Sequence, residues 1–271
     1  MSVELQNLAT EIALQAGELI HRRRREGVTV AASKSSAEDV VTLADRESED
    51  LIRSLIADAR PGDGFYGEES AATGSTTGIT WVVDPIDGTV NYLYDIPNYA
   101  VSIGVVEGEP DPHSWTALAA AVTNPAAGET YSAARGTGAT LNGRVIRANT
   151  DVTPSLAMIG TGFSYTAERR IWQAGIVQQL IGQVRDIRRM GSAALDLCSV
   201  ASGRLDAYYE RGLNPWDHAA GVLIAQEAGA LVGGLHGAAA SRDFTLAAAA
   251  SLFEPLHEML IEAGAEASVL G

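Results

Sequence analysis

The sequence predicts a mixed α/β protein, with an α+β first half and an alternating α/β second half. Two amphipathic helical patterns open the chain, a run of short apolar segments follows, and strands then alternate with helices to the end. The 271 residues, 46% of them hydrophobic, are enough to bury a substantial core. Cys198 is the only cysteine, which excludes an internal disulfide, and we expect its thiol to be buried in a helix.

Two helices are predicted at the start of the chain. The first has apolar residues at three- and four-residue steps from Leu5 to Leu19 and ends at Gly27. Residues 22–25, four consecutive arginines, suit the negative end of that helix, so we interpret them as a solvated helix end rather than a nucleic-acid contact. The second helix carries an apolar face from Ala44 to Ile56 and stops before Pro61.

The rest of the first half has the pattern of strands. β-type runs occupy residues 79–84, 99–106, 115–123, 129–134 and 138–141, and Asn142-Gly143 is typical of a hairpin turn. The short spacing between these runs predicts a largely antiparallel sheet.

The second half alternates strands with helices, which is typical of layered α/β proteins. Strands are predicted at 155–160, 185–188, 206–209 and 245–249, and helices at 167–181, 192–201, 218–228 and 252–263. The pattern changes near residues 145–155, so we expect two lobes, residues 1–148 and residues 149–271.

The chain is strongly acidic. Its 19 basic and 34 acidic residues give a net charge of −15, which disfavours nonspecific binding to nucleic acid or anionic membranes. No apolar run is long enough to span a membrane and no signal-peptide pattern opens the chain, so a cytoplasmic location is expected. The acid excess serves either solubility or the binding of cations, and composition alone leaves both open.

The strongest motif is Asp84-Pro85-Ile86-Asp87-Gly88-Thr89. An apolar strand delivers Asp84 at its end, and Asp87 follows closely enough for both carboxylates to reach one cation. Pro85 stiffens the turn and Gly88 lets a ligand approach the backbone. A short helix beginning at Thr89 would offer N–H groups to an anion such as phosphate. Oxygen ligands of this kind favour Mg²⁺ or Mn²⁺ over zinc.

Two further acidic features accompany this motif. Glu68-Glu69 follows Gly67 and precedes the Asp84 strand by a short loop. Asp217 follows Pro215-Trp216 where a helix N-cap is expected, so either capping or cation binding explains it.

Together these stretches resemble the inositol monophosphatase family, most closely its bacterial SuhB-like members of actinobacteria. The matches include Gly67-Glu68-Glu69-Ser70, the run from Trp81 to Tyr92, and Asn214-Pro215-Trp216-Asp217. Supporting matches are Lys34, Asp45, Gly191-Ser192-Ala193-Ala194 and the run from Gly203 to Glu210. The matches follow the family order over almost the whole chain. The resemblance implies an αβαβα sandwich of the sugar-phosphatase type, which fructose-1,6-bisphosphatase shares.

The resemblance also implies a metal centre with two or three Mg²⁺ ions, for which Mn²⁺ would substitute. Glu68, Asp84 and the Ile86 carbonyl would hold the first ion. Asp84, Asp87 and Asp217 would hold the second, with Asp84 bridging, and Glu68 would also hold a third, weaker ion.

Further roles are implied for catalysis and substrate binding. Asp45 and Thr89 would orient the attacking water, with Glu68 as a further catalytic residue, and Lys34 would lie in a mobile loop near the metals. The implied substrate-binding residues are Asp87, Gly88, Thr89, Gly191, Ser192, Ala193, Glu210 and Asp217.

The predicted activity is hydrolysis of myo-inositol 1-phosphate by a metal-activated water. Alternatives are phosphatases for fructose 1,6-bisphosphate, histidinol phosphate or a 3′-phosphonucleotide, but no basic motif for a second phosphate stands out in the sequence. An accessory protein for RNA or transcription on the same fold is an alternative of another class. The resemblance also implies a homodimer inhibited by lithium. Asp95 departs from the family pattern and predicts extra negative charge at the pocket rim, whereas His218 is interpreted as a structural histidine.

Overall fold

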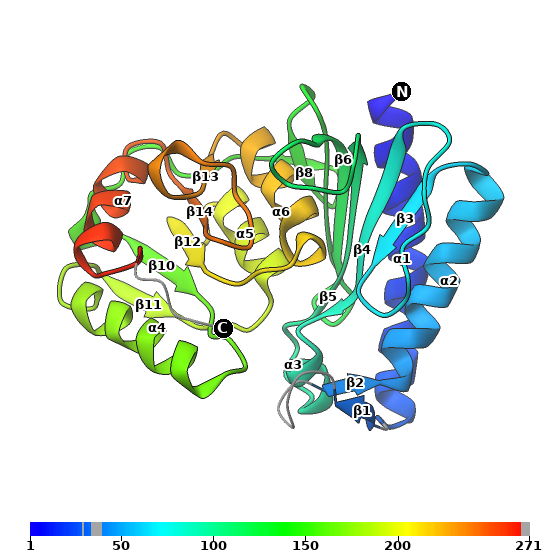
Figure 1. Cartoon of the computed structure of the whole chain (residues 1–271), viewed down its shortest axis with the longest axis horizontal. Helices are drawn as coiled ribbons and strands as arrows, with labels where there is room; N and C mark the ends of the chain where they lie inside the picture. Colours follow the sequence, from blue (N-terminus) through cyan, green and yellow to red (C-terminus); the bar gives the residue numbers. More distant parts are fainter. Residues whose placement is uncertain (29, 34–39, 267–271) are drawn as a thin grey trace.

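The computed structural model describes residues 1–266 apart from residues 29 and 34–39, and these residues form two β-sheets with helices around them (Figure 1). In this part of the chain, the larger sheet has seven strands in the order β3-β4-β5-β6-β7-β8-β9, and the smaller has five in the order β11-β10-β12-β14-β13. A separate antiparallel pair is formed by β1 (Val30–Ser33) and β2 (Val40–Thr42).

The larger sheet is built from β3 (Gly64–Gly67), β4 (Ile79–Asp87), β5 (Ala100–Glu107), β6 (Thr116–Asn124), β7 (Glu129–Ala134), β8 (Ala139–Leu141) and β9 (Arg144–Ile146). The smaller sheet is built from β10 (Met158–Thr161), β11 (Asp186–Arg188), β12 (Ala207–Glu210), β13 (Leu231–Gly233) and β14 (Thr245–Ala248). The helices are α1 (Ser2–Glu26), α2 (Leu43–Ala59), α3 (Thr89–Leu93), α4 (Ala167–Leu180), α5 (Ala193–Ala201), α6 (Pro215–Glu227) and α7 (Phe253–Glu262).

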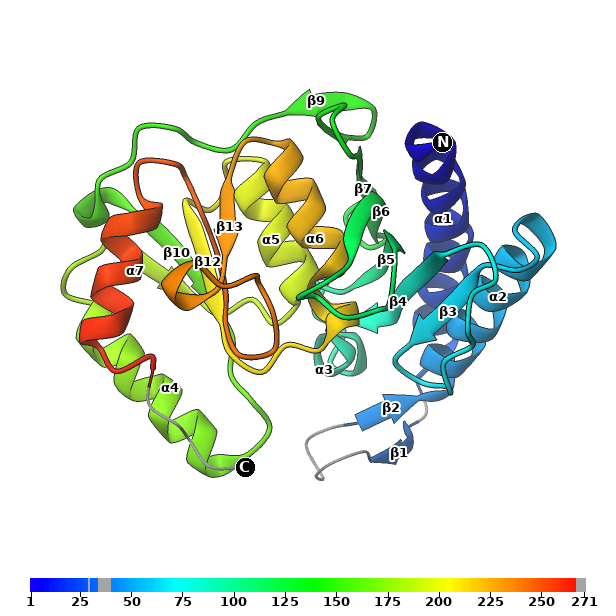
Figure 2. The ribbon, with the colours of Figure 1, turned by 45° about the horizontal axis from the view of Figure 1, so that its top comes forward.

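The elements stack in five layers, which confirms the predicted αβαβα class. Helices α1 and α2 pack on one face of the larger sheet, α5 and α6 lie between the sheets, and α4 and α7 cover the far face of the smaller sheet (Figures 1 and 2). Every residue of α5 is buried, as expected of a helix enclosed on all sides. Gly221 on α6 lets α5 approach closely, because a Cβ there would lie 2.7 Å from the Leu197 Cβ.

The structure confirms most predicted elements and corrects several. The larger sheet is antiparallel as expected except that β3 runs parallel to β4. Strands β3 and β13 were not predicted, because each is short and lies next to a turn. The strand expected at 155–160 begins only at Met158, since Pro154–Leu156 forms a 3₁₀ turn. Cys198 is buried in α5 as predicted.

The arginine run at the end of α1 is engaged within the chain. Arg23 forms ion pairs with Glu26 at 2.8 Å and with Glu47 on α2 at 2.6 Å, and Arg24 pairs with Asp95 at 3.0 Å. The larger-sheet strands end at Ile146 and the smaller-sheet strands begin at Met158; the division into lobes at residues 148/149 stays a prediction. Within the described residues, no helix is both long and apolar enough to cross a membrane.

Candidate active site

A bulge in β4 brings two aspartates to the same side of the sheet. In a regular strand, side chains three residues apart point to opposite faces. In the pairing of β4 with β5, Asp84 lies opposite Ser102 and Asp87 lies opposite Ala100. An advance of three residues along β4 is therefore matched by only two residues along β5. The extra residue reverses the alternation, and Pro85, which has no N–H to give to a ladder, lies inside the irregular segment. The strand therefore extends to Asp87 rather than ending at Asp84 as predicted.

The turn after β4 can be made only with glycine. Gly88 has φ +93°, and a Cβ there would lie 3.0 Å from the Asn98 carbonyl and 3.1 Å from the Gly191 carbonyl. The short helix α3 follows at once, as predicted. The Thr89 hydroxyl lies 3.0 Å from the Ile86 carbonyl and 3.2 Å from Asp45 Oδ1, where it can donate to either.

Asp45 is buried beneath this turn at the start of α2. It closes a capping box in which its Oδ2 accepts hydrogen bonds from the Thr42 backbone N–H at 2.8 Å and the Thr42 hydroxyl at 2.5 Å. Burial raises the pKa of Asp45 to about 7, although the two bonds from Thr42 oppose the rise. The carboxyl is thus poised to exchange a proton near neutral pH, with the Thr89 hydroxyl as its neighbour.

The turn that carries Glu68 is held by a buried carboxylate on α2. Glu49 is 2% exposed, and it accepts hydrogen bonds from the Glu69 backbone N–H at 2.8 Å and from the Ser70 hydroxyl. A Cβ at Gly67 would collide with the same carboxylate, so glycine is required there. Glu49 was not singled out in the sequence, because a glutamate on a helix is common and its partners lie twenty residues away.

Asp217 lies in the first turn of α6, although not at the position predicted. The N-cap is Asn214, and Asp217 is the third helical residue, whose Oδ2 accepts the Asn214 backbone N–H at 2.7 Å. This capping box orients the carboxylate toward the end of β4. Burial and the negative charges of Glu68 and Asp87 raise the pKa of Asp217 well above its usual value.

Asp87 links the end of β4 in the larger sheet to the start of α5. Its Oδ2 accepts the Ser192 hydroxyl at 2.6 Å and the Ala194 backbone N–H at 2.7 Å, at the start of α5. Nearby, the Asn91 side chain donates to the Met190 carbonyl at 2.8 Å. Burial raises the pKa of Asp87 to about 6 against these hydrogen bonds.

Glu210, at the end of β12, forms the far wall of the site. The Tyr208 hydroxyl donates to it at 2.5 Å, and a Cβ at Gly162 would collide with its carboxylate. Burial raises the pKa of Glu210 to about 7. Beside it lies Asp196 on α5, 2% exposed, whose pKa burial raises well above the usual value.

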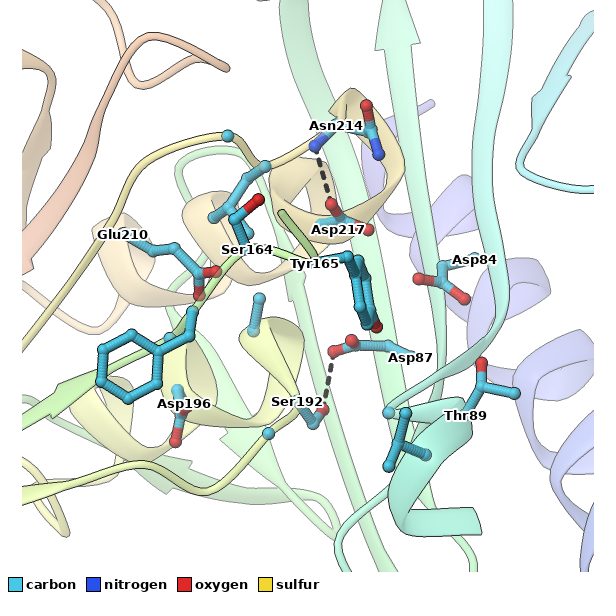
Figure 3. Close-up of a pocket in the computed structure, with 18 of the residues that line it drawn as sticks. Asp84, Asp87, Thr89, Ser164, Tyr165, Ser192, Asp196, Glu210, Asn214 and Asp217 are labelled. Carbon is cyan, nitrogen blue, oxygen red and sulfur yellow. Dashed lines mark hydrogen bonds between the residues drawn. The ribbon is translucent and has the colours of Figure 1, made fainter. Parts of the chain in front are cut away.

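These residues surround one cavity of about 960 Å³. Figure 3 shows Asp84, Asp87 and Asp217 on one side of it and Glu210 on the other. The predicted residues that line it are Glu68, Asp84, Ile86, Asp87, Gly88, Thr89, Gly191, Ser192, Ala193, Glu210 and Asp217. Asp45 lies behind the lining, in contact through Thr89. Lys34 lies outside the described residues.

The acidic end of the cavity has the chemistry of a divalent-cation site. Its ligating groups are all oxygens, which suit Mg²⁺ or Mn²⁺. The mutual repulsion that raises the pKa of Asp217 is relieved when a cation neutralises the group. As the side chains stand, no three His, Cys, Asp or Glu residues of the described part converge closely enough to hold an ion. In this arrangement Asp84, Asp87 and Asp217 accept hydrogen bonds from backbone N–H groups, and Asp87 also accepts one from the Ser192 hydroxyl.

The structure corrects two expectations about the cavity, on Asp95 and on basic residues, and confirms that His218 is not part of it. Asp95 does not line the cavity, and its charge is offset by Arg24. His218 lines a separate cavity, where its ring lies 6.0 Å from that of Trp115, and burial lowers its pKa to about 4. A basic wall is present although the sequence shows no motif for it, because its five members are scattered along the chain: Arg169, Arg170, Arg189, Arg211 and Arg242.

Solved structures share this architecture and cover nearly the whole chain. The structure of Mycobacterium tuberculosis SuhB aligns with a TM-score of 0.83 at 41% identity, covering 98% of this chain and 99% of that one. The extragenic suppressor protein suhB from Bartonella henselae aligns with a TM-score of 0.87 at 32% identity, covering 95% and 98%. The fold and its carboxylate-lined cavity are those of a phosphatase.

The chain belongs to the inositol monophosphatase family, whose model matches residues 1–268. It is 46% identical over 246 residues to the inositol-1-monophosphatase SuhB of Mycobacterium tuberculosis H37Rv, covering 84% of this chain and 83% of the relative. It is also 38% identical over 229 residues to the Nus factor SuhB of Escherichia coli K12, covering 83% of each.

Proposed function

We propose that the protein is a Mg²⁺-dependent phosphomonoesterase that hydrolyses myo-inositol 1-phosphate to myo-inositol and phosphate. The observation that carries this proposal is one cavity with an acidic, oxygen-only end at β4 and α6 and a carboxylate, Glu210, on the opposite wall. The first end suits a cation-bound phosphate, and the second suits the hydroxyls of a polyol. Mycobacterial relatives named inositol-1-monophosphatase support the choice of substrate.

Glu68, Asp84, Asp87, Asp217 and the Ile86 carbonyl would hold two or three Mg²⁺ ions. Bound Mg²⁺ would supply positive charge that polarises the phosphate and makes nearby water more acidic. The remaining steps fall to residues of the chain.

In the proposed reaction, Thr89 and Asp45 orient a water for in-line attack on phosphorus. The Thr89 hydroxyl points its proton toward Asp45 and accepts a hydrogen bond from the water, and Asp45 takes up the proton, which its pKa of about 7 permits near neutral pH. The Gly88 and Thr89 backbone N–H groups receive the phosphate at the start of α3. Gly191, Ser192 and Ala193 line the alcohol half, where Glu210 accepts hydrogen bonds from ring hydroxyls.

The test is phosphate release by the full-length protein, with Mg²⁺ titration, from four substrates: myo-inositol 1-phosphate, fructose 1,6-bisphosphate, histidinol phosphate and 3′-phosphoadenosine 5′-phosphate. We expect Mg²⁺-dependent turnover with inositol phosphate among the two highest kcat/KM values. Turnover independent of divalent cations would contradict the metal assignment. Inositol phosphate as one of the two poorest substrates would contradict the named substrate while leaving a phosphatase in place.

A second candidate function is favoured by the relatives named Nus factor SuhB, which suggest an accessory role in transcription. Two of the four consecutive arginines, Arg23 and Arg24, are already paired within the chain, so the run is a weaker basic patch than its sequence indicates. Under this second function, replacing Arg22 and Arg25 with glutamine would weaken salt-dependent RNA binding and leave phosphatase activity intact. We further expect a cytoplasmic homodimer that lithium inhibits.

A further inference from the structure

A second, smaller cavity lies beside α6 and takes part in no step of the proposed reaction. Its volume is about 370 Å³, which falls within the range of about 300–1,000 Å³ usual for small-molecule sites. Among the described residues it shares no lining residue with the larger cavity. The two cavities are therefore separate, and we call the smaller one the α6 cavity.

One buried side chain of the α6 cavity has hydrogen-bonding groups that are unused. His218 lines the cavity and is only 1% exposed. Neither of its ring nitrogens has a hydrogen-bond partner within the described part of the chain. Buried polar groups are normally paired, because an unpaired one loses its hydration without compensation. A bound molecule that pairs with the imidazole ring would explain this side chain.

The wall beside His218 is aromatic and aliphatic. The Trp115 ring lies 6.0 Å from the His218 ring and is tilted by 51° against it, and Val222 and Leu223 of α6 line the cavity close by. Aromatic side chains favour offset or tilted contacts with a second ring. The middle of the α6 cavity therefore suits a flat, apolar group.

The rim of the α6 cavity offers one available positive charge. Arg135 lines the cavity and is exposed, and its side chain forms no ion pair or hydrogen bond with the described residues. The other charged lining residue, Glu227, is already engaged, because it accepts the backbone N–H groups of Gly136 at 2.7 Å and Gly138 at 2.8 Å. A free guanidinium group pairs well with a carboxylate.

The polar groups lie toward opposite ends of the α6 cavity. His218 and Glu227 are nine residues apart on α6, which places their backbones about 13 Å apart along the helix axis. Arg135 lies near the Glu227 end, because Glu227 holds the turn that follows it. A molecule in the cavity therefore meets the imidazole at one end, apolar walls in the middle and the guanidinium at the other end.

We propose that the α6 cavity binds a small aromatic acid that carries a hydroxyl group at the end opposite its carboxylate. The hydroxyl pairs with His218, the ring lies against Trp115, and the carboxylate pairs with Arg135. A hydroxyl suits the imidazole because it both donates and accepts, whichever ring nitrogen bears the proton. The site is separate from the acidic end, so binding requires neither Mg²⁺ nor phosphatase activity.

The test is an NMR titration of the full-length protein with three probes built on one ring. The probes are 4-hydroxybenzoate, benzoate, which lacks the hydroxyl, and 4-hydroxybenzyl alcohol, which lacks the charge. We expect 4-hydroxybenzoate to bind with a Kd of about 1 mM or below, and each of the other two to bind at least about tenfold more weakly. The values should be the same in EDTA and in the Asp84→Asn variant.

Two variants assign the two ends of the probe. His218→Phe keeps a flat ring and removes both nitrogens, so it should weaken 4-hydroxybenzoate at least about fivefold and leave benzoate unchanged. Arg135→Gln should weaken both acids and leave 4-hydroxybenzyl alcohol unchanged. The matched control is Arg144→Gln, which removes one exposed arginine on β9, outside the α6 cavity, and should leave all three probes unchanged.

No saturable binding of 4-hydroxybenzoate to the wild-type protein would overturn the proposal. Equal weakening of all three probes by His218→Phe would also overturn it, since a merely structural role of the histidine would have that effect. Unchanged binding of both acids to Arg135→Gln would show that they are held elsewhere. If His218→Phe does not fold, the Arg135→Gln variant decides alone. Because no readout depends on phosphate release, failure here leaves the proposed function standing.

Discussion

The two halves of the active-site cavity are built in opposite ways. The acidic end is rigid, because its side chains lie on β4 and at the start of α6 and most of them accept backbone hydrogen bonds. The five arginines of the basic wall lie on helix and loop positions, and three of them are exposed: Arg170, Arg189 and Arg242. The carboxylates of the acidic end are therefore positioned by backbone contacts, whereas the basic wall is built from side chains at the surface of the cavity.

Removing one negative charge from the acidic end should lower the enzymatic activity more than any other change considered. We expect Asp84→Asn to lower kcat/KM for myo-inositol 1-phosphate by more than about 1,000-fold, because it removes a carboxylate assigned to two cations. Steady-state kinetics across a Mg²⁺ titration measures this. Retention of more than about a tenth of the wild-type activity would show that the two-metal assignment is wrong.

A smaller loss is expected from the residue that holds the acidic end in place. Glu49→Gln keeps the shape of the side chain but weakens its bonds to the Glu69 N–H and the Ser70 hydroxyl. We expect the Mg²⁺ concentration for half-maximal activity to rise about tenfold, with kcat at saturating Mg²⁺ largely retained. The neighbouring exposed Asp50→Asn is the control and should behave as wild type. If kcat falls and the Mg²⁺ requirement does not move, Glu49 does not position the metal site.

The buried carboxyl groups in and behind the cavity wall should also make the stability of the metal-free protein sensitive to pH. Burial raises the pKa values of Asp45, Asp87 and Glu210 to about 6–7, so the folded state binds more protons than the unfolded state between about pH 4 and pH 7. Their contribution to stability is present at low pH and lost as the pH rises through 6–7. The Tm in EDTA should fall by at least about 4 °C from pH 5 to pH 8, and Mg²⁺ should restore it more at pH 8. A Tm that rises over this interval would contradict these pKa shifts.

Prediction from sequence succeeded for elements whose signal lies in neighbouring residues, and it failed for features that are assembled from distant parts of the chain. The Asp84–Thr89 motif and the α1 and α2 patterns were clear, because neighbouring residues carry the signal. The bulge at Pro85 was not predicted, since its evidence lies in the pairing with β5. The basic wall was missed for the same reason, because its arginines span more than seventy positions and meet only in the folded chain. Asp217 was predicted to be the N-cap of α6, whereas the structure places Asn214 there. Both residue types are common N-caps, so the sequence alone does not decide between them.

The central claim is that the acidic end is a cation site with Asp84 at its centre. Counting Mn²⁺ ions bound at saturation by equilibrium dialysis, in the presence of phosphate and without any turnover, tests it most directly. The account predicts two or more ions per wild-type chain and at least one fewer in a folded Asp84→Asn variant. An unchanged count in that variant, or no saturable binding to the wild-type chain, would contradict it.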